Sequence, residues 1–297
     1  MSTTHPVSHS ERWGLPLPAS GRTKRASRGR ASRDSGRRVG GRHRWLRTRT
    51  GRALAGLLGL LIFVGVWKFA QASGWAQPGT IPDPWKIPEA FLQEWDSGRL
   101  LSSLGSSLIH YSWGLAMGAA LGLAIGAGSA LSTLADAMLG WLVRILRPIP
   151  PLAWIVFAIA WFKVTHAGAA FVIAIGVFWV VYFTAYSAVR GVDPRYNELA
   201  RAFGQDGWVR RLRDVTLPSA APGILAGVRT AVGQAWMVLI AAELIGMPGM
   251  GQEINAAAGV GAYNTVVVYM LVISFVYTLC DTAFLQFEKR VLRWRPS

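Results

Sequence analysis

The sequence contains a single cysteine, few charged residues and none of the short motifs that mark common catalytic or metal sites. Cys280 has no partner within the chain, so an intrachain disulfide is excluded. The chain has no C-x-x-C or H-E-x-x-H for a metal ion, no G-x-S-x-G for a nucleophilic serine and no Walker A loop for ATP. We therefore expect no catalytic residue, no metal site, no cofactor and no ATP hydrolysis by this chain itself.

Charge is scarce and unevenly distributed. Only 15% of the 297 residues are charged and 52% are hydrophobic, whereas soluble domains carry about 25% charge. Residues 1–52 hold 14 of the 31 lysines and arginines but only two acids, so they supply +12 of the net charge of +16. This composition is typical of a membrane protein with a basic appendage.

The basic tail over residues 1–52 is rich in arginine, serine and glycine and has almost no apolar periodicity. Such a segment cannot bury enough surface to offset its ordering entropy, so we expect it to be disordered. The favoured interpretation is a cytoplasmic anchor resting on anionic lipid, and we expect no specific nucleic acid as a partner. Nonspecific binding of nucleic acid through the arginine runs, or a cleaved targeting sequence, remain alternatives.

Six segments of residues 53–297 are long and apolar enough to cross a membrane, which needs about 20 residues. They are residues 53–73, 105–129, 139–162, 168–189, 223–246 and 264–286. With six spans, the tail, the loop 190–222 and the C-terminus fall on one side. These are the basic parts of the chain, which predicts that both termini are cytoplasmic in a multi-pass protein of the inner (plasma) membrane.

Two patterns within the spans predict packing and bending. Gly114, Gly118, Gly122 and Gly126 are spaced four apart and predict a smooth helix face that another helix approaches closely. The run "RPIPPLAW" over 147–154 places three prolines in the third span, which must break or kink it. Broken helices at membrane depth often line a pathway.

The sequence of the loop 190–222 predicts two short helices. Asp193 precedes a proline and predicts a helix start, Gly204 predicts a turn, and Pro218 is expected to stop the second helix. Such a compact, charged unit between two spans is suited to docking another protein.

The loop resembles the EAA motif of permease subunits of binding-protein-dependent ABC importers. The match lies in "ELA" at 198–200, Gly204 and "VTLP" at 215–218. "LRPIPPLAW", "VRGVDPRYNELARAFG" and "GMGQEI" extend the resemblance to the nitrate, sulfonate and taurine branch, over about residues 80–295. The chain departs from the family pattern in two places. The spacing from Gly204 to Pro218 is one residue longer than expected for the family. Lys163 follows Trp161-Phe162, where relatives often have glycine.

The resemblance implies an all-α, MetI-like bundle of six transmembrane helices, as in type I ABC importer permeases. It implies two copies of a cytoplasmic ATPase, an extracytoplasmic solute-binding protein and a second permease copy, together carrying an aliphatic sulfonate, taurine or nitrate. The residues it assigns to the ATPase-coupling loop are Glu198, Ala200, Gly204, Val215, Leu217 and Pro218. Glu198 and Ala200 are expected to present one face to the ATPase, and Leu217-Pro218 to end the docking unit.

The candidate pathway or gate residues are Pro150, Pro151, Trp154, Trp236 and Glu243. Ionisable groups within spans are functional candidates by default.

For several polar residues, a structural role is the alternative to a functional one. Two roles are open for Glu243: pairing with a cation such as Lys163 or Arg99, or helping to set the external gate. Arg229 is expected to extend from one turn into its span to the cytoplasmic surface. Asp281 is expected to pair internally. A stand-alone secondary transporter or channel is the alternative function, and a membrane-embedded enzyme is less favoured because these groups form no catalytic pair.

Overall fold

A computed structural model describes residues 49–74, 79–204 and 207–294 of the chain. The basic tail therefore lies outside the described residues up to position 48, and its last four residues begin the first helix. The chain divides into two compact units within that helix, the first ending at Leu60 and the second beginning at Leu61.

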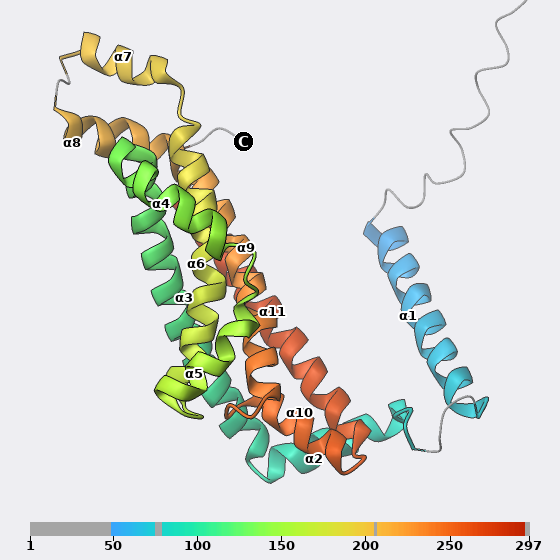
Figure 1. Cartoon of the computed structure of the whole chain (residues 1–297). Coiled ribbons are helices and arrows are strands. Elements are labelled where there is room, and N and C mark those ends of the chain that lie inside the picture. Colours follow the sequence, from blue (N-terminus) through green and yellow to red (C-terminus); the bar gives the residue numbers. More distant parts are fainter. Residues whose placement is uncertain (1–48, 75–78, 205–206, 295–297) are drawn as a thin grey trace, which may run out of the picture. The chain divides into compact units, whose positions relative to one another are not determined.

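Helices make up the secondary structure of the described residues (Figure 1). The longer ones are α1 (Arg49–Ala72), α3 (Arg99–Leu131), α6 (His166–Arg190), α9 (Leu217–Leu244) and α11 (Tyr263–Val291). The shorter ones are α2 (Ile87–Asp96), α4 (Thr133–Leu146), α5 (Ile155–Phe162), α7 (Pro194–Ala202), α8 (Trp208–Arg211) and α10 (Met250–Gly259), with 3₁₀ turns η2 (Pro84–Lys86) and η3 (Pro151–Trp154) and the π-helical turn η4 (Leu212–Thr216).

Among the described residues, five helices are long and apolar enough to span a membrane, and a sixth span forms if α4 and the η3–α5 segment are counted together. The last two are bent by 89° at the prolines, as the sequence predicts. Each of the six predicted segments overlaps one of these helices or the bent pair, which confirms the all-α fold class. The helix that contains the predicted span 105–129 is longer than that span, since α3 begins at Arg99, directly after Gly98 in a left-handed conformation.

The centre of the second unit consists of α3, α6 and α9, and α6 contacts both of the others. The predicted glycine face of α3 packs directly on α6. A β-carbon added to Gly118 would lie 2.5 Å from the carbonyl oxygen of Ala174, and one added to Gly126 would lie 2.5 Å from that of Tyr182. The backbones approach so closely that only glycine fits, which confirms the predicted packing role.

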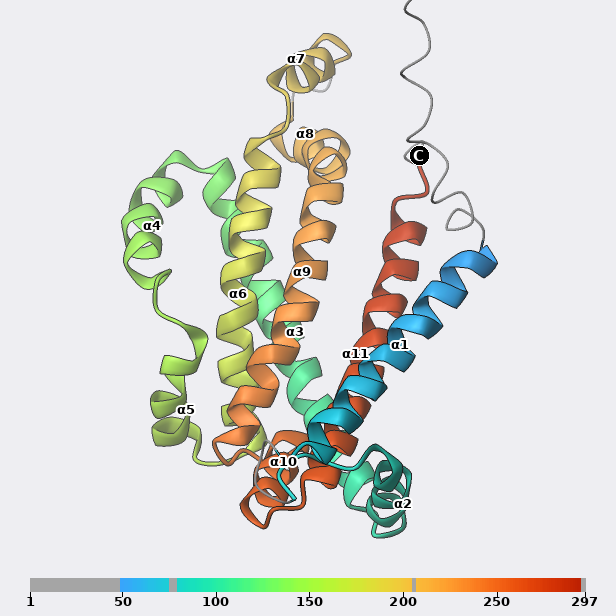
Figure 2. The same ribbon diagram turned by 90° about the vertical axis from the view of Figure 1, so that its right-hand side faces the viewer.

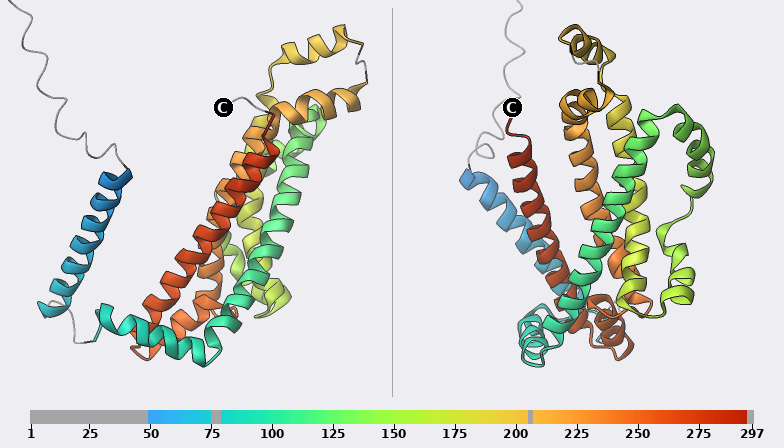
Figure 3. Two further views of the ribbon diagram at one scale, coloured as in Figure 1. Left: turned by 180° about the vertical axis from the view of Figure 1, so that it is seen from behind. Right: turned by 90° about the vertical axis from the view of Figure 1, so that its left-hand side faces the viewer.

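The two ends of the bundle carry different elements. α7 and α8 lie together at one end, beside the C-terminal end of α11 (Figures 1 and 2). α2 and α10 lie at the opposite end (Figure 3). The loop 190–222 and the end of α11, which both carry basic residues, therefore share one end, as the predicted topology requires.

The prediction that Pro218 stops the second loop helix is wrong. α8, η4 and α9 form one continuous helical element from Trp208 to Leu244. Pro218 has no N–H, but it sits in the first turn of α9 directly after the π-helical turn, where the hydrogen-bond register changes and one donor fewer is tolerated. A π-helical turn accommodates one residue more than an α-helical turn, which gives the extra residue between Gly204 and Pro218 a place.

Candidate functional site

The loop between α6 and α9 folds as a helical hairpin whose corners are set by local chemistry. Asp193 caps α7, since its Oδ1 accepts a hydrogen bond of 2.9 Å from the backbone N–H of Arg195. Gly204 follows α7 at φ 78°, a left-handed conformation in which glycine avoids the cost of a β-carbon. These two positions agree with the sequence-based prediction.

The candidate coupling residues do not form one surface. Glu198 is exposed, but Ala200 is buried, and α7 contacts the π-helical turn. The prediction that both present one face is wrong, because residues two apart on a helix point in nearly opposite directions. Val215 and Pro218 are half-buried and Leu217 is 39% exposed, so they belong to the root of the hairpin.

The outer surface of the hairpin is apolar and aromatic, which the sequence reasoning missed. Tyr196, Leu199 and Phe203 are 55%, 56% and 79% exposed. Their spacing of three and four places them on one face of α7, and this spacing is the signal that could have revealed them. Trp208 and Val209, at the start of α8, are 67% and 57% exposed. We call these five residues the hairpin patch.

Basic groups lie beside the hairpin patch. A groove of about 660 Å³ is lined by Gly204, Gly207, Val209, Arg210, Arg213 and Asp214. Aromatic residues and arginine are the types enriched where proteins bind proteins. The hairpin therefore combines an exposed apolar stripe with a mainly basic groove.

The proline break of the third span lies against the middle of the bundle. Pro150 stands before η3, and the ring of Pro151 lies beside Gly176 of α6: a β-carbon added there would be 3.4 Å from Pro151 Cγ and 3.1 Å from Val238 Cγ2. The break thus contacts both α6 and α9. Only one side of the break packs on protein, because Pro150 and Leu152 remain exposed.

The two candidate pathway tryptophans differ in how deeply they are buried. Trp154 is half-buried at the end of η3, whereas Trp236 is only 4% exposed and packs on Tyr111 with ring centroids 4.8 Å apart. Both indole Nε1 atoms are buried without a hydrogen-bond partner. Trp236 therefore lies in the protomer core and contributes no pathway surface in this conformation.

Glu243 is completely buried, and its predicted pairing with Lys163 or Arg99 is wrong. Its Oε1 accepts a hydrogen bond of 2.7 Å from Ser107 Oγ, and its Oε2 accepts one of 2.8 Å from the backbone N–H of Gly251. Ser107 Oγ in turn accepts from the N–H of Met250 at 3.0 Å. The carboxylate thus caps the N-terminus of α10, where N–H groups and the helix dipole favour negative charge, and it ties α9 to α3 and α10.

Two histidines extend this buried cluster to the surface. His110 Nδ1 lies 3.4 Å from Glu243 Oε1, and His110 Nε2 forms a short contact with Nδ1 of His166. His110 is fully buried, while His166, the first residue of α6, is exposed. The contact is a hydrogen bond when one of the two facing nitrogens carries a proton and the other accepts it.

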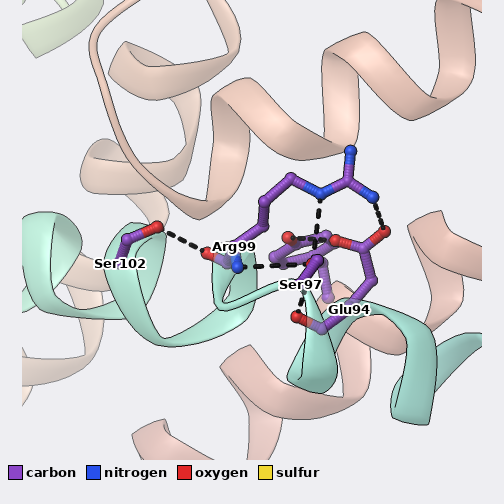
Figure 4. A network of polar contacts seen from close by, with 5 residues as sticks. Glu94, Ser97, Arg99 and Ser102 are labelled. Carbon is purple, nitrogen blue, oxygen red and sulfur yellow. Dashed lines mark hydrogen bonds and ion pairs between the residues drawn. The ribbon is translucent and has the colours of Figure 1, made fainter.

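Arg99 is engaged elsewhere, with the buried carboxylate of Glu94 (Figure 4). Arg99 Nη2 donates to Glu94 Oε1 at 2.8 Å, and the hydroxyl of Tyr269 donates to Glu94 Oε2 at 2.9 Å. This network joins α2, the start of α3 and α11. It explains why Arg99 is not available to Glu243.

Lys163 is the only residue other than glycine with a positive φ among the described parts of the chain. It ends α5 at φ 59°, ψ −166°, a region that is nearly restricted to glycine. The lysine that departs from the expected glycine therefore occupies a strained backbone position.

We expect Lys163→Gly to stabilise the protein by about 1–2 kcal/mol, because it relieves this strain. The measurement is the thermal unfolding midpoint of the detergent-solubilised chain. Lys163→Ala is the matched control, since it removes the same side chain but keeps the β-carbon. Equal stabilisation by both variants would show that side-chain loss, and not backbone strain, is responsible.

Arg229 is also placed differently from its prediction. The helix begins at Leu217, six residues before the predicted span, and the Arg229 guanidinium pairs with Asp281 of α11. The internal pairing predicted for Asp281 is confirmed.

The apolar helices, the broken span and the helical hairpin define the class of protein. This is a multi-pass helical membrane protein with a helical hairpin between two of its apolar helices.

The chain belongs to the family of binding-protein-dependent transport system inner membrane components, whose model matches residues 118–293. It is an ABC importer permease of the nitrate, sulfonate and taurine branch, located in the inner membrane.

Relatives with curated names are similar over most of their length. The chain is 31% identical to the putative aliphatic sulfonates transport permease protein SsuC of Bacillus subtilis, over 82% of this chain and 88% of the relative. It is 30% identical to the bicarbonate transport system permease protein CmpB of Synechococcus elongatus, over 89% and 98%. The taurine transport system permease protein TauC of Escherichia coli is 26% identical over 79% and 87%.

Solved structures share the fold. An inward-facing structure of the MetNI methionine ABC transporter superposes with a TM-score of 0.55 at 19% identity, covering 65% of this chain and 95% of that one. The resemblance to a MetI-like bundle is thereby confirmed at the level of fold.

Proposed function

We propose that this chain forms half of the solute pathway of an ABC importer, together with a second permease copy. Two ATPase subunits dock on the α7–α8 hairpins from the cytoplasm. A solute-binding protein delivers its ligand at the opposite end, where α2 and α10 lie. Both chain termini are then cytoplasmic, in keeping with the basic residues at the hairpin end.

The observation that carries this proposal is the hairpin patch. Single exposed apolar residues are ordinary, but five on one small hairpin beside a basic groove mark a docking surface. Tyr196, Phe203 and Trp208 supply aromatic anchors of the kind that dominate binding energy at protein interfaces. Gly204 supplies the turn that joins the two halves of the patch.

The continuous helical element from Trp208 to Leu244 connects this surface with the far end of the bundle. Movement of the hairpin on ATP binding is transmitted along it as a rigid body, from α8 through α9 to the cluster at Glu243. Since Glu243 holds α10 and α3, that end is suited to act as the external gate. Alternating access follows when the hairpin end and the Glu243 end open in turn.

The transported solute is a small oxyanion in this proposal. The relatives named above are permeases for aliphatic sulfonates, bicarbonate and taurine. These solutes share a compact oxyanion group, carboxylate or sulfonate in type. The binding protein, a separate polypeptide, makes the finer selection.

The test is capture of the ATPase from native membranes in mild detergent with tagged permease. We expect Phe203→Ala with Trp208→Ala to lower ATPase recovery by at least about thirtyfold, since losing even one aromatic anchor of about 2 kcal/mol weakens binding by that factor. Glu198→Ala and Gly204→Asp test, by the same capture experiment, whether the residues that match the EAA motif contribute to ATPase binding. Trp85→Ala is the matched control, because Trp85 is 74% exposed at the end away from the hairpin.

Undiminished recovery with the double variant would refute docking through the hairpin patch. A folded permease that captures no ATPase at all would favour the alternative function, a stand-alone transporter.

A further inference from the structure

An ion pair lies near the middle of two spans. Arg229 is the thirteenth of the 28 residues of α9, and Asp281 is the nineteenth of the 29 residues of α11. At 1.5 Å per residue, both lie roughly 15–18 Å from the hairpin ends of their helices. Helices of 28 and 29 residues are roughly 42–44 Å long, longer than the hydrocarbon core of about 30 Å. A bilayer centred on them places the pair roughly 8–12 Å inside the core.

The pair is open to one side of the protomer. Arg229 and Asp281 are 40% and 26% exposed, and they lie in a groove of about 400 Å³ between α9 and α11. The groove is lined by Ala226, Arg229, Thr230, Gly233, Tyr277, Asp281 and Glu288. Most of these residues are polar or charged, whereas the pocket between α2 and α11 is lined by apolar residues such as Leu271 and Phe275.

The hydrogen bonds leave part of the guanidinium available. Arg229 Nε donates to Asp281 Oδ1 at 3.1 Å, and Nη2 donates to Oδ2 at 3.2 Å. This side-on pairing uses two of the five N–H donors of arginine. The remaining donors include both of Nη1, so the end of the guanidinium keeps the fork that matches an oxyanion.

A polar groove at this depth does not face lipid. A central arginine or aspartate costs about 2.5–3.5 kcal/mol in a lipid-exposed position, so such residues face protein or water. Arg229 does not extend to the surface, because Asp281 holds its head group beside α11. The groove therefore faces the space shared with another permease copy, where the pathway runs if the proposed function is correct.

We propose that this groove is an anion-binding station of the pathway, in which the free edge of the Arg229 guanidinium binds a small oxyanion. The Thr230 and Tyr277 hydroxyls lie in the same groove and provide further polar contacts. Asp281 is a positioning residue. It fixes the orientation of the Arg229 guanidinium and lowers its affinity for the anion, so that the solute dissociates again. Glu288 lies two turns closer to the hairpin end of α11 and adds a second carboxylate on that side of the anion-binding groove. The inference names the solute contact of the proposed importer and rests on that function.

The single native cysteine makes a direct test practicable. In a Cys280→Ser background, Thr230→Cys places one thiol in the groove. Its reaction rate is measured in membranes, without ATP, with a sulfonate-bearing methanethiosulfonate and with its trimethylammonium counterpart. The anionic reagent also carries the oxyanion group in question. Ile62→Cys, 58% exposed near the middle of α1, is the control for a lipid-facing site.

We expect the groove thiol to react with the anionic reagent at least about tenfold faster than with the cationic one, after correction for their rates with a free thiol. Arg229→Gln should abolish this preference, and Arg229→Lys should retain part of it. Sodium ethanesulfonate should slow the reaction when Arg229 is present, whereas sodium chloride of equal ionic strength should not. The Ile62→Cys thiol should remain unreactive to both reagents.

Faster reaction with the cationic reagent, or no preference, would overturn the proposal, as would a groove thiol as unreactive as the control. If Arg229→Gln does not fold, Asp281→Asn decides: it frees the guanidinium and should raise the anion preference, and an unchanged preference would contradict the inference. Because the reaction needs no ATPase, failure here is distinguishable from failure of the docking experiment.

Discussion

Replacing Gly118 with alanine is expected to destabilise the permease by about 3 kcal/mol or more and to lower its yield in membranes. The new β-carbon would lie 2.5 Å from the carbonyl oxygen of Ala174 and 2.7 Å from Val177 Cβ. Backbone of α6 has to move to relieve the contact, and overpacking of this kind typically costs 1–3 kcal/mol even where side chains can adjust. The measurement is the thermal midpoint of the detergent-solubilised chain.

Gly105→Ala provides the control on the same helix. A β-carbon there meets nothing within 4 Å, so the variant should be neutral or more stable by up to about 1 kcal/mol, the difference in helix propensity. A Gly118→Ala variant as stable as Gly105→Ala would mean that α3 and α6 do not pack as the structure shows.

Replacing Gly249 with alanine is expected to cost about 3–5 kcal/mol and to detach α10 from the bundle. Gly249 has φ 154° and ψ −170°, which is nearly restricted to glycine, and an added β-carbon would lie 2.1 Å from Glu243 Oε1. Displacing that carboxylate would leave Ser107 and the N–H of Gly251 buried without their acceptor. Each lost partner costs about 1–3 kcal/mol.

Gly246→Ala separates the two contributions. Gly246 lies in the same loop at φ 115°, but a β-carbon there has open space, so only backbone strain of about 1–3 kcal/mol is expected. The larger loss in Gly249→Ala measures the clash with Glu243. If both variants lose the same stability, the Glu243 cluster does not hold this loop in place.

The sequence predicted the larger features because they follow from regular patterns. Long apolar runs predict spans, and glycines four apart predict a face that only a close helix can fill, as Gly118 and Gly126 do. The capping residue Asp193 and the turn at Gly204 were predictable because their chemistry is local. The hairpin was predictable for the same reason.

The errors arose where distant residues determine the outcome. Pro218 was predicted to end a helix. The prediction failed because the π-helical turn that accommodates this proline is not visible in the local sequence. Glu243 was assigned to Lys163 or Arg99 by charge, but its partners are Ser107 and a backbone N–H. Hydrogen bonds between helices depend on rotation and depth, which sequence spacing does not specify.

By itself, the sequence determined that this chain is a membrane-spanning helical protein of the ABC permease family with a helical hairpin between two spans. Hydropathy, charge asymmetry and local turn chemistry are properties of contiguous residues, so they can be seen in the chain. Only the tertiary structure decided that Glu243 caps α10, that Trp236 is in the core and that Arg229 lies with Asp281 in a groove at mid-depth. Those features depend on which faces of separate helices meet, and packing of the whole bundle sets that.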